Sequence, residues 1–184
     1  MLTAAAMNCA TMRHAVALLT LMLTGVATQV CATGAGGAPM APAAEHGAMT
    51  VLHSVPVQAK VIALTFDLGC SARRDAVEGI LLSLDKRGAH CTWFLTGWLL
   101  RNMPDLVPKL AARGDDLANH TDTHPHCRGI SSARLQRELQ QVEQLLAARG
   151  YALSTPKYFR PPFGEYNERV MSVVAGLGYR TVLW

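Results

Sequence analysis

Two histidines four positions apart are the first residues of this sequence whose types and spacing suggest chemistry. His120 and His124 lie in the polar segment 119–125, with Asp122 between them. If the chain turns helically after His120, both imidazoles point the same way and can share one metal ion. Histidine pairs at this spacing are more often structural, but the polar residues around this pair favour a ligand role. Asp122 then faces away from the pair, at the surface or behind the ligands.

A carboxylate and a guanidinium are the next candidates, and each has an ordinary structural alternative. Asp67 stands where an apolar run that begins at residue 60 meets Gly69. It is either a general base at a strand end or the first residue of an Asx turn. Arg160 is followed by two prolines, which hold it on a stiff loop, either in a site or at the surface.

Strands and helices alternate along the part of the chain that carries these residues. Short β-branched and aromatic runs predict five strands, over residues 60–66, 91–95, 116–119, 157–160 and 179–184. Apolar residues at helical spacing predict four helices, over residues 77–87, 104–113, 131–149 and 167–177. This alternation implies parallel strands joined by right-handed crossovers, so the predicted class is α/β.

All the candidate residues fall at carboxyl ends of predicted strands. Asp67 follows the first strand, the two histidines follow the third, and Arg160 ends the fourth. In parallel sheets and barrels these ends meet at one edge, where the sites of such folds gather. Core packing does not explain four polar groups at three such ends, so the sequence predicts that they form one site.

The motifs around these residues resemble those of a known family. Segments 65–67, 120–125 and 160–164, together with segments 92–97 and 178–184, are similar to the polysaccharide deacetylases with the NodB homology domain, carbohydrate esterase family 4. The resemblance covers about residues 61–184 and keeps the motifs in order. It implies a distorted (β/α) barrel short of eight units, here incomplete, with about five strands and four helices.

The resemblance also implies an activity and gives each candidate residue a role. Members of the family hydrolyse N-acetyl groups of amino sugars, or in some cases O-acetyl esters of xylan, with a divalent metal that is usually zinc. His120 and His124 resemble the two metal-binding histidines. Asp67 resembles the catalytic base, and Arg160 the arginine that holds this carboxylate in place. The implied partner is an acetylated polysaccharide, such as peptidoglycan, chitin oligosaccharide or xylan.

Two features depart from the family pattern. Leu68 stands where the family usually has a second aspartate, the third metal ligand, and its side chain cannot bind a cation. Asp122, Cys70 and His126 are the substitutes that this sequence offers. The family also continues into further strands and a late histidine that acts as general acid, and neither follows Trp184.

The second departure predicts an incomplete barrel. Five strands cannot close it, so we expect a fragment whose last strand leaves an open apolar edge at residues 181–184. The competing interpretation is a catalytically inactive relic or a carbohydrate-binding module of the same fold. A thiol-based redox protein is disfavoured because no Cys-x-x-Cys motif occurs.

The N-terminal residues predict export. Residues 1–32 contain one cation, Arg13, and an apolar run over residues 15–26 that is too short to span a bilayer. Small residues at the end of this segment predict a signal peptide cleaved after Ala32, and hence a secreted, periplasmic or cell-envelope protein without a stable membrane span. An uncleaved anchor and a lipid-anchored Cys31 are the alternatives. Residues 33–59 read as a flexible linker and residues 60–184 as the deacetylase part.

Composition excludes several other classes. Of the 184 residues, 50% are hydrophobic and 16% charged, which argues against intrinsic disorder. The net charge of +4 comes without a basic cluster, so we expect no nucleic-acid partner. Outside the signal peptide the cysteines are Cys70, Cys91 and Cys127. In an oxidising compartment a Cys70–Cys127 disulfide is one alternative and free thiols are the other, and the sequence leaves this open. The sequence does not determine the oligomeric state.

Overall fold

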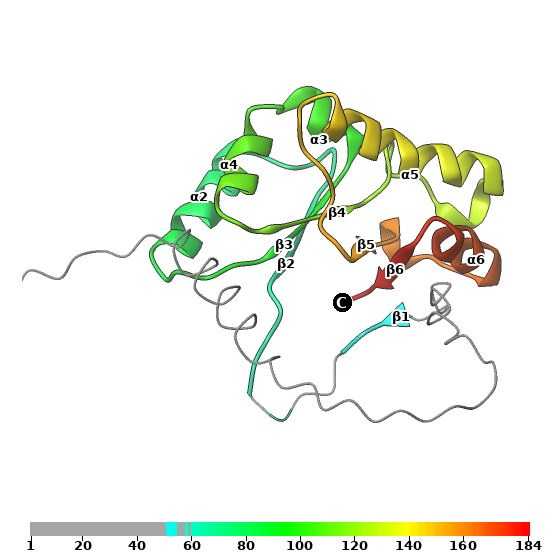
Figure 1. The fold of residues 1–184 in the computed structure, drawn as a ribbon, viewed down its shortest axis with the longest axis horizontal. Coiled ribbons are helices and arrows are strands. Elements are labelled where there is room, and N and C mark those ends of the chain that lie inside the picture. Colours follow the sequence, from blue (N-terminus) through cyan, green and yellow to red (C-terminus); the bar gives the residue numbers. More distant parts are fainter. Residues whose placement is uncertain (1–50, 55–57, 59) are drawn as a thin grey trace, which may run out of the picture. The chain divides into compact units, whose positions relative to one another are not determined.

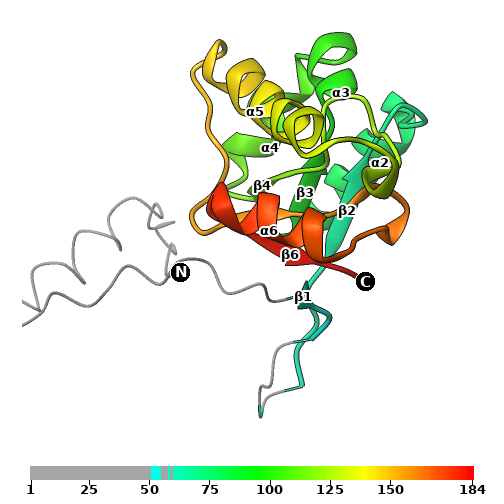
Figure 2. The same ribbon diagram turned by 90° about the vertical axis from the view of Figure 1, so that its right-hand side faces the viewer.

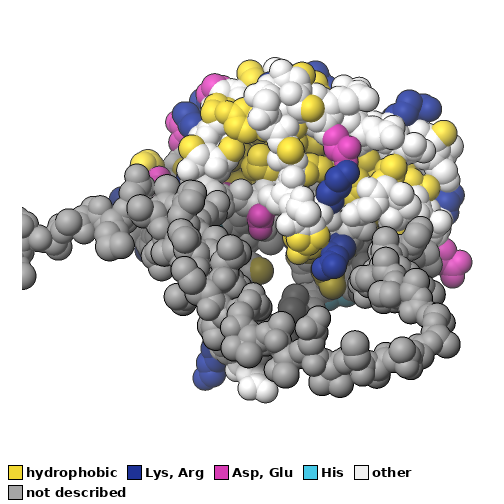
Figure 3. All heavy atoms as spheres, in the orientation of Figure 1, with side chains coloured by type: hydrophobic (Ala, Val, Ile, Leu, Met, Phe, Trp, Pro, Cys, Tyr) yellow, Lys and Arg dark blue, Asp and Glu magenta, His cyan; other side chains and the backbone are white. Residues whose placement is uncertain are grey.

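The computed structural model describes residues 51–54, 58 and 60–184. The predicted signal peptide over residues 1–32 and most of the predicted linker lie outside these residues. No helix in the described part of the chain is long and apolar enough to cross a membrane. Lys and Arg side chains occur in several separate places on the face shown in Figure 3, rather than in one continuous patch.

The described residues form an α/β structure around one parallel sheet, as the sequence predicts (Figure 1). Its strands lie in the order β1-β6-β5-β4-β3-β2. They are β1 (Val51–Leu52), β2 (Thr65–Leu68), β3 (Thr92–Leu95), β4 (Asp116–Asn119), β5 (Lys157–Phe159) and β6 (Tyr179–Val182). Every neighbouring pair is parallel. The sheet is therefore the incomplete, open form of a barrel.

The helices lie along one side of this sheet (Figures 1 and 2). They are α2 (Arg74–Asp85), α3 (Gly97–Asn102), α4 (Leu106–Ala112), α5 (Ser132–Ala147) and α6 (Glu168–Gly176), with short 3₁₀ turns η1 (Cys127–Gly129) and η2 (Pro162–Gly164). Side chains of Thr96, Ser131 and Asn167 accept backbone hydrogen bonds at the first turns of α3, α5 and α6. The sequence analysis missed α3, because six residues are too few to show helical periodicity.

The first predicted strand is displaced in the structure. The apolar run from residue 60 was expected to be a buried strand, but β2 begins only at Thr65 and continues through Leu68. Val61 and Ile62 are 65% and 84% exposed, so these side chains do not enter the core. The reason is the neighbouring strand: β3 begins at Thr92, opposite Thr65, and earlier residues have no strand to pair with.

Strand β1 corrects two further expectations. It lies inside residues 33–59, which the sequence indicated as a linker. It also pairs with β6, and Leu183 N–H donates to the carbonyl oxygen of Leu52 at 2.9 Å. The expected open edge at residues 181–184 is therefore covered in part. A strand of two residues is too short to show an alternating pattern, and only pairing with β6 defines it.

Alternation along the strands separates a packed face from a polar one. Successive strand residues point to opposite faces. Leu68, Trp93 and Leu95 belong to the buried cluster that packs against α2 and α4. The residues between them face the other way, and Asp67 stands opposite Phe94 in the pairing of β2 with β3. The sheet thus presents Asp67 on the face that the helices leave uncovered.

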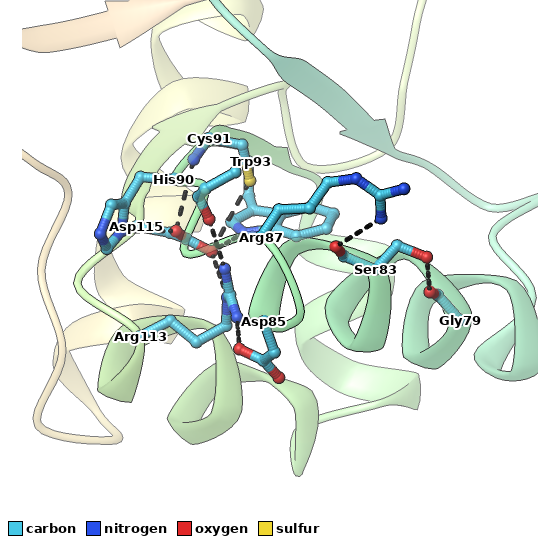
Figure 4. A network of polar contacts seen from close by, with 10 residues as sticks. Gly79, Ser83, Asp85, Arg87, His90, Cys91, Trp93, Arg113 and Asp115 are labelled. Atoms are coloured by element: carbon cyan, nitrogen blue, oxygen red, sulfur yellow. Dashed lines mark hydrogen bonds and ion pairs between the residues drawn. The ribbon is translucent and has the colours of Figure 1, made fainter.

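A buried carboxylate ties the amino ends of β3 and β4 together (Figure 4). The Asp115 side chain is fully buried and accepts from Trp93 Nε1 at 2.9 Å and Arg113 Nε at 2.8 Å. The backbone N–H of Cys91 donates to it at 3.3 Å. Burial alone would raise the pKa of Asp115, but the hydrogen bonds from Trp93 and Arg113 outweigh it and hold the pKa below its usual value.

The cysteines do not form the disulfide that the sequence left open. Cys70, Cys91 and Cys127 are all free thiols in the described residues, so the Cys70–Cys127 pairing is wrong for this structure. Cys70 is exposed, whereas Cys127 is buried in the cluster beneath α5 and α6. Burial raises the pKa of both Cys91 and Cys127 to about 12, so these two behave as small apolar side chains.

Replacing the buried carboxylate should cost stability. We expect Asp115→Asn to lower the free energy of unfolding by about 3 kcal/mol at pH 7, because the largely buried Arg113 loses its buried counter-charge and keeps as a charged partner the exposed Asp85. A pKa lowered by folding stabilises the protein above the unfolded-state value of about 4 and loses this contribution as the pH falls further. The difference between wild type and variant should therefore shrink towards pH 3.

Urea unfolding at pH 7, 5 and 3 measures both effects. Glu78→Gln is the matched control, since it removes an exposed pair with Lys109 (3.0 Å) and should change stability by less than about 0.5 kcal/mol. Equal unfolding midpoints for Asp115→Asn and Glu78→Gln would contradict the assigned role of Asp115.

Candidate active site

Arg160 joins the strands that carry the candidate residues. It follows β5, and its backbone N–H donates to the carbonyl oxygen of Asn119 at 3.0 Å. Its side chain is only 3% exposed, with Nη1 donating to Asp67 Oδ1 at 2.7 Å and Nη2 to Thr65 Oγ1 at 3.0 Å. The guanidinium carbon also lies 4.0 Å from the centre of the Phe94 ring. The structure thus brings the Arg160 guanidinium into contact with the Asp67 carboxylate. The roles of the two residues stay a prediction.

The Asp67 carboxylate is fixed on one side and open on the other. Oδ1 accepts the hydrogen bond from Arg160, which orients the group. The side chain is 34% exposed, so it stays accessible to a small molecule. Asp67 lies within β2 rather than after it, and its face is shared with Thr65, two residues earlier. Alternate residues of a strand share a face, so the two-residue spacing from Asp67 was the sequence signal that could have identified Thr65 as a neighbour of the site.

His120 is held by both of its neighbouring strands. It follows β4, and its backbone N–H donates to the carbonyl oxygen of Leu95 at 2.9 Å. Its Nδ1 lies 2.7 Å from the carbonyl oxygen of Arg160. Because a carbonyl only accepts, Nδ1 carries the proton and Nε2 keeps its lone pair. Nε2 lies 3.9 Å from Asp67 Oδ2.

The two imidazoles lie together and are uncharged. Their ring centres are 4.9 Å apart. Burial lowers the pKa of His120 below its usual value, although the nearby Asp67 carboxylate raises it in part. The pKa of His124 is lowered for the same main reason. Neutral imidazole is the form that binds metals, so the pair is in the correct protonation state for ligands.

The loop that carries the histidines is not the helical turn that the spacing suggested. Thr121 and His124 have φ angles of 68° and 58°, in the left-handed region. Such a conformation costs about 1–3 kcal/mol for a non-glycine residue and persists only when neighbouring groups enforce it. Asn119 Oδ1 accepts from the backbone N–H of Thr121 at 2.9 Å, and Thr121 Oγ1 accepts from that of His124 at 3.1 Å.

The first turn of α3 packs against the same loop. The backbone N–H groups of Gly97 and Trp98 donate to the carbonyl oxygens of Thr121 and Asp122, each at 3.1 Å. The Asp122 carboxylate pairs with Arg101 of α3 at 2.7 Å. The open N–H groups at a helix start thus fix two carbonyl oxygens of the histidine loop.

None of the proposed substitutes joins the histidines as a third ligand. Asp122 is paired with Arg101, His126 lies 3.1 Å from Glu165, and Cys70 is exposed. Leu68 is 4% exposed and packs in the core, on the opposite face of β2 from Asp67. Among the described residues, no group of three or more His, Cys, Asp or Glu could hold a metal ion. In the described residues, the two imidazoles are thus the donors available to a metal ion, and this donor set is incomplete.

An exposed aromatic ring lies next to the histidines. Phe163 of η2 is 54% exposed, and its ring centre lies 4.7 Å from that of His124. It also stacks on His126 at 4.2 Å. The φ angle of Phe163 is 59°, so the loop after Arg160 is held in an uncommon conformation here. The sequence analysis named this motif but assigned no role to Phe163.

Comparison with known proteins places this geometry among deacetylases. Residues 54–182 match the sequence profile of the family described as polysaccharide deacetylase. Peptidoglycan-N-acetylglucosamine deacetylase from Bacillus cereus is 30% identical over 134 residues, which cover 73% of this chain and 61% of that protein. Across the first curated relatives that it matches, the chain spans 46%, 61% and 33% of their lengths.

Solved structures give the same result. A family 4 carbohydrate esterase from Streptomyces lividans, in complex with acetate, superposes with a TM-score of 0.59 and 36% identity, covering 67% of this chain and 62% of that one. A family 4 pseudoenzyme from Bacillus anthracis has a TM-score of 0.67 at 21% identity, covering 74% of this chain and 47% of that one. At 21% identity, the similarity to the pseudoenzyme shows the fold alone.

A methyl group at Gly97 should disturb the histidine loop. A Cβ there would lie 1.7 Å from Asp122 Oδ1 and 2.9 Å from its Cγ, so the carboxylate must leave Arg101. We expect Gly97→Ala to lower the free energy of unfolding by about 1–3 kcal/mol, as overpacking does. Chemical denaturation measures the loss.

Gly79→Ala is the control, because Gly79 lies in α2 with no atom within 4 Å of the added methyl group. Alanine is the better helix former, so this variant should gain about 0.5–1 kcal/mol. A Gly97→Ala variant as stable as wild type would show that α3 does not fix the loop in this way.

Proposed function

Because the chain belongs to the polysaccharide deacetylase family, we propose that this domain removes N-acetyl or O-acetyl groups from a polysaccharide such as peptidoglycan or chitin oligosaccharide. The observation that carries the proposal is the buried Arg160, which aims a partly open Asp67 carboxylate beside His120. The similarity to a peptidoglycan-N-acetylglucosamine deacetylase supports the substrate class. Because the chain spans only part of its relatives, the activity of the whole protein belongs to this proposal.

Asp67 is the base in the proposed reaction. An amide carbonyl is a poor electrophile, so hydrolysis needs an activated water molecule and a polarised oxygen. Oδ1 is engaged by Arg160, which leaves Oδ2 to take the proton from water. Arg160 orients the carboxylate, and its own carbonyl oxygen fixes the proton of His120 on Nδ1.

His120 and His124 would hold a divalent metal ion, zinc in the first place. When bound, such an ion polarises the acyl oxygen and lowers the pKa of water to about 7. The protein's part is to keep both imidazoles neutral and close together, through burial and through the hydrogen bond to Nδ1 of His120. We further propose, from residues 1–32, that the protein acts outside the cytoplasmic membrane or in the cell envelope.

Leu68 favours a second candidate function. Its side chain packs in the core, so β2 supplies no ligand beside the base. A protein with a weakened metal site but an intact fold would bind an acetylated polysaccharide without cleaving it. This second candidate is therefore a non-catalytic carbohydrate-binding domain.

Acetate release distinguishes the two candidates. The purified chain is incubated with acetylated peptidoglycan, chitin oligosaccharides and acetylated xylan, with zinc or with a chelator. Chelator-sensitive release of acetate supports the deacetylase. Binding of one of these glycans without acetate release, at any metal concentration, would contradict the deacetylase and support the carbohydrate-binding domain.

Removal of either imidazole should remove metal and activity together. We expect His120→Ala and His124→Ala to lose bound zinc, measured by elemental analysis, and to lose acetate release, because each leaves a single histidine ligand. His53→Ala is the control, since His53 is an exposed residue beside β1 and lies in none of the motifs. Unchanged zinc content in both site variants would refute the ligand assignment.

Removal of the base should separate catalysis from metal binding. We expect Asp67→Asn to keep its zinc while turnover falls by a factor of about 10²–10⁴, since the amide cannot accept the proton from water. Steady-state kinetics and metal analysis on the same sample provide the test. Near-normal turnover in the Asn variant is the result that would exclude Asp67 as the base.

A further inference from the structure

Helix α5 carries a buried charge that the proposed reaction does not use. Glu138 is 6% exposed and lies on the same stripe as Leu135, Leu139 and Val142, which pack into the core. A carboxylate at such a position is costly unless its oxygens find hydrogen-bond donors. The helix therefore brings an acceptor group into the interior for a specific set of donors.

Those donors belong to the histidine loop. The backbone N–H of Thr123 donates to Glu138 Oε2 at 2.7 Å, and its hydroxyl donates to Oε1 at 2.8 Å. Arg134, one turn earlier on α5, lies 3.6 Å from Oε1 and is half exposed. Both carboxylate oxygens are thus used by one residue, and that residue directly precedes His124.

Glu138 contacts the left-handed segment of the histidine loop, residues 121–124. Thr121 and His124 both adopt left-handed conformations, and Thr123 lies between them. His120 is fixed independently, because its backbone bonds to Leu95 and its ring to Arg160. For His124, the contacts that restrain the backbone are the Thr121 hydroxyl and, one residue away, Glu138.

We propose that Glu138 is a positioning residue that sets the place of the His124 imidazole, and through it the geometry of the two-histidine site. The expected effect on zinc affinity rests on the proposed function, whereas the positioning of His124 by Glu138 does not. A carboxylate suits the observed arrangement, because the backbone N–H of Thr123 only donates and its hydroxyl also donates here. Glutamine keeps an acceptor for the backbone N–H, but its NH₂ group meets the hydroxyl as a donor, so that second bond must reverse its direction.

The test compares four variants of the whole chain. Glu138→Ala removes both acceptors, Glu138→Gln keeps one, and Thr123→Val removes the hydroxyl but keeps the backbone N–H. Arg134→Gln is the matched control, since it removes the ion pair but leaves both bonds from Thr123. The readouts are the imidazole resonances of His120 and His124 in the metal-free protein and the zinc dissociation constant by calorimetry.

We expect the His124 resonance to shift and broaden in Glu138→Ala while that of His120 stays in place. Glu138→Gln and Thr123→Val should give smaller changes in the same direction, and Arg134→Gln none. Zinc dissociation constants should rise about 10–100-fold in Glu138→Ala, as when a ligand loses its supporting contact. If Glu138→Ala does not fold, the Gln and Val variants carry the same comparison.

Two results would overturn the proposal. One is a His124 resonance that is unchanged in the Ala, Gln and Val variants, and the other is equal movement of both histidine resonances, which indicates general destabilisation. Failure of the proposed function is a separate outcome. It would appear as a wild-type chain without zinc binding or acetate release, and the metal-free resonances would still report whether Glu138 positions His124.

Discussion

The buried guanidinium of Arg160 is the interaction on which the site depends. A charge withdrawn from water must find its partners within the protein, at a cost of several kcal/mol if they are missing. Here the side chain reaches across the inner face of the sheet to Asp67 and Thr65, while the carbonyl oxygen of the same residue fixes the ring of His120. One residue thus orients the Asp67 carboxylate and one histidine together. Its Nε atom has no hydrogen-bond partner among the described residues, so the compensation comes from the pairing at the other two nitrogens and from the Phe94 ring beside the guanidinium.

The histidine loop shows how a strained backbone is maintained close to such a pair. Left-handed Thr121 and His124 would relax in an isolated segment, since each costs about 1–3 kcal/mol. The loop is instead enclosed by groups from three elements: Asn119 at the end of β4, the first turn of α3, and α5. This explains why α3 begins with Gly97, where any larger residue would meet the Asp122 carboxylate. The hydrogen bonds from these surrounding elements keep the loop in its strained conformation.

Leu68 shows how strand geometry limits the site. Neighbouring residues of a strand point to opposite faces, so Asp67 and the residue after it cannot face the same way within β2. Because β2 continues through Leu68, this side chain is directed to the helices and contributes to the core. The protein gains buried apolar surface at this position and leaves the two imidazoles without a third protein ligand among the described residues. Stability of the fold and completeness of the proposed metal site are therefore in competition at one residue.

The sequence by itself determined the class of fold and four of the helices, and it singled out four polar residues that the structure brings close together. It could do so because strand and helix periods are local, and because polar residues at strand ends are conspicuous against apolar runs. It did not determine β1, which is too short to show a pattern, or the start of β2, which depends on where β3 begins. The left-handed loop and the burial of Glu138 were also decided only by the tertiary structure. Both arise from hydrogen bonds between residues distant in the chain, and no local pattern encodes those partners.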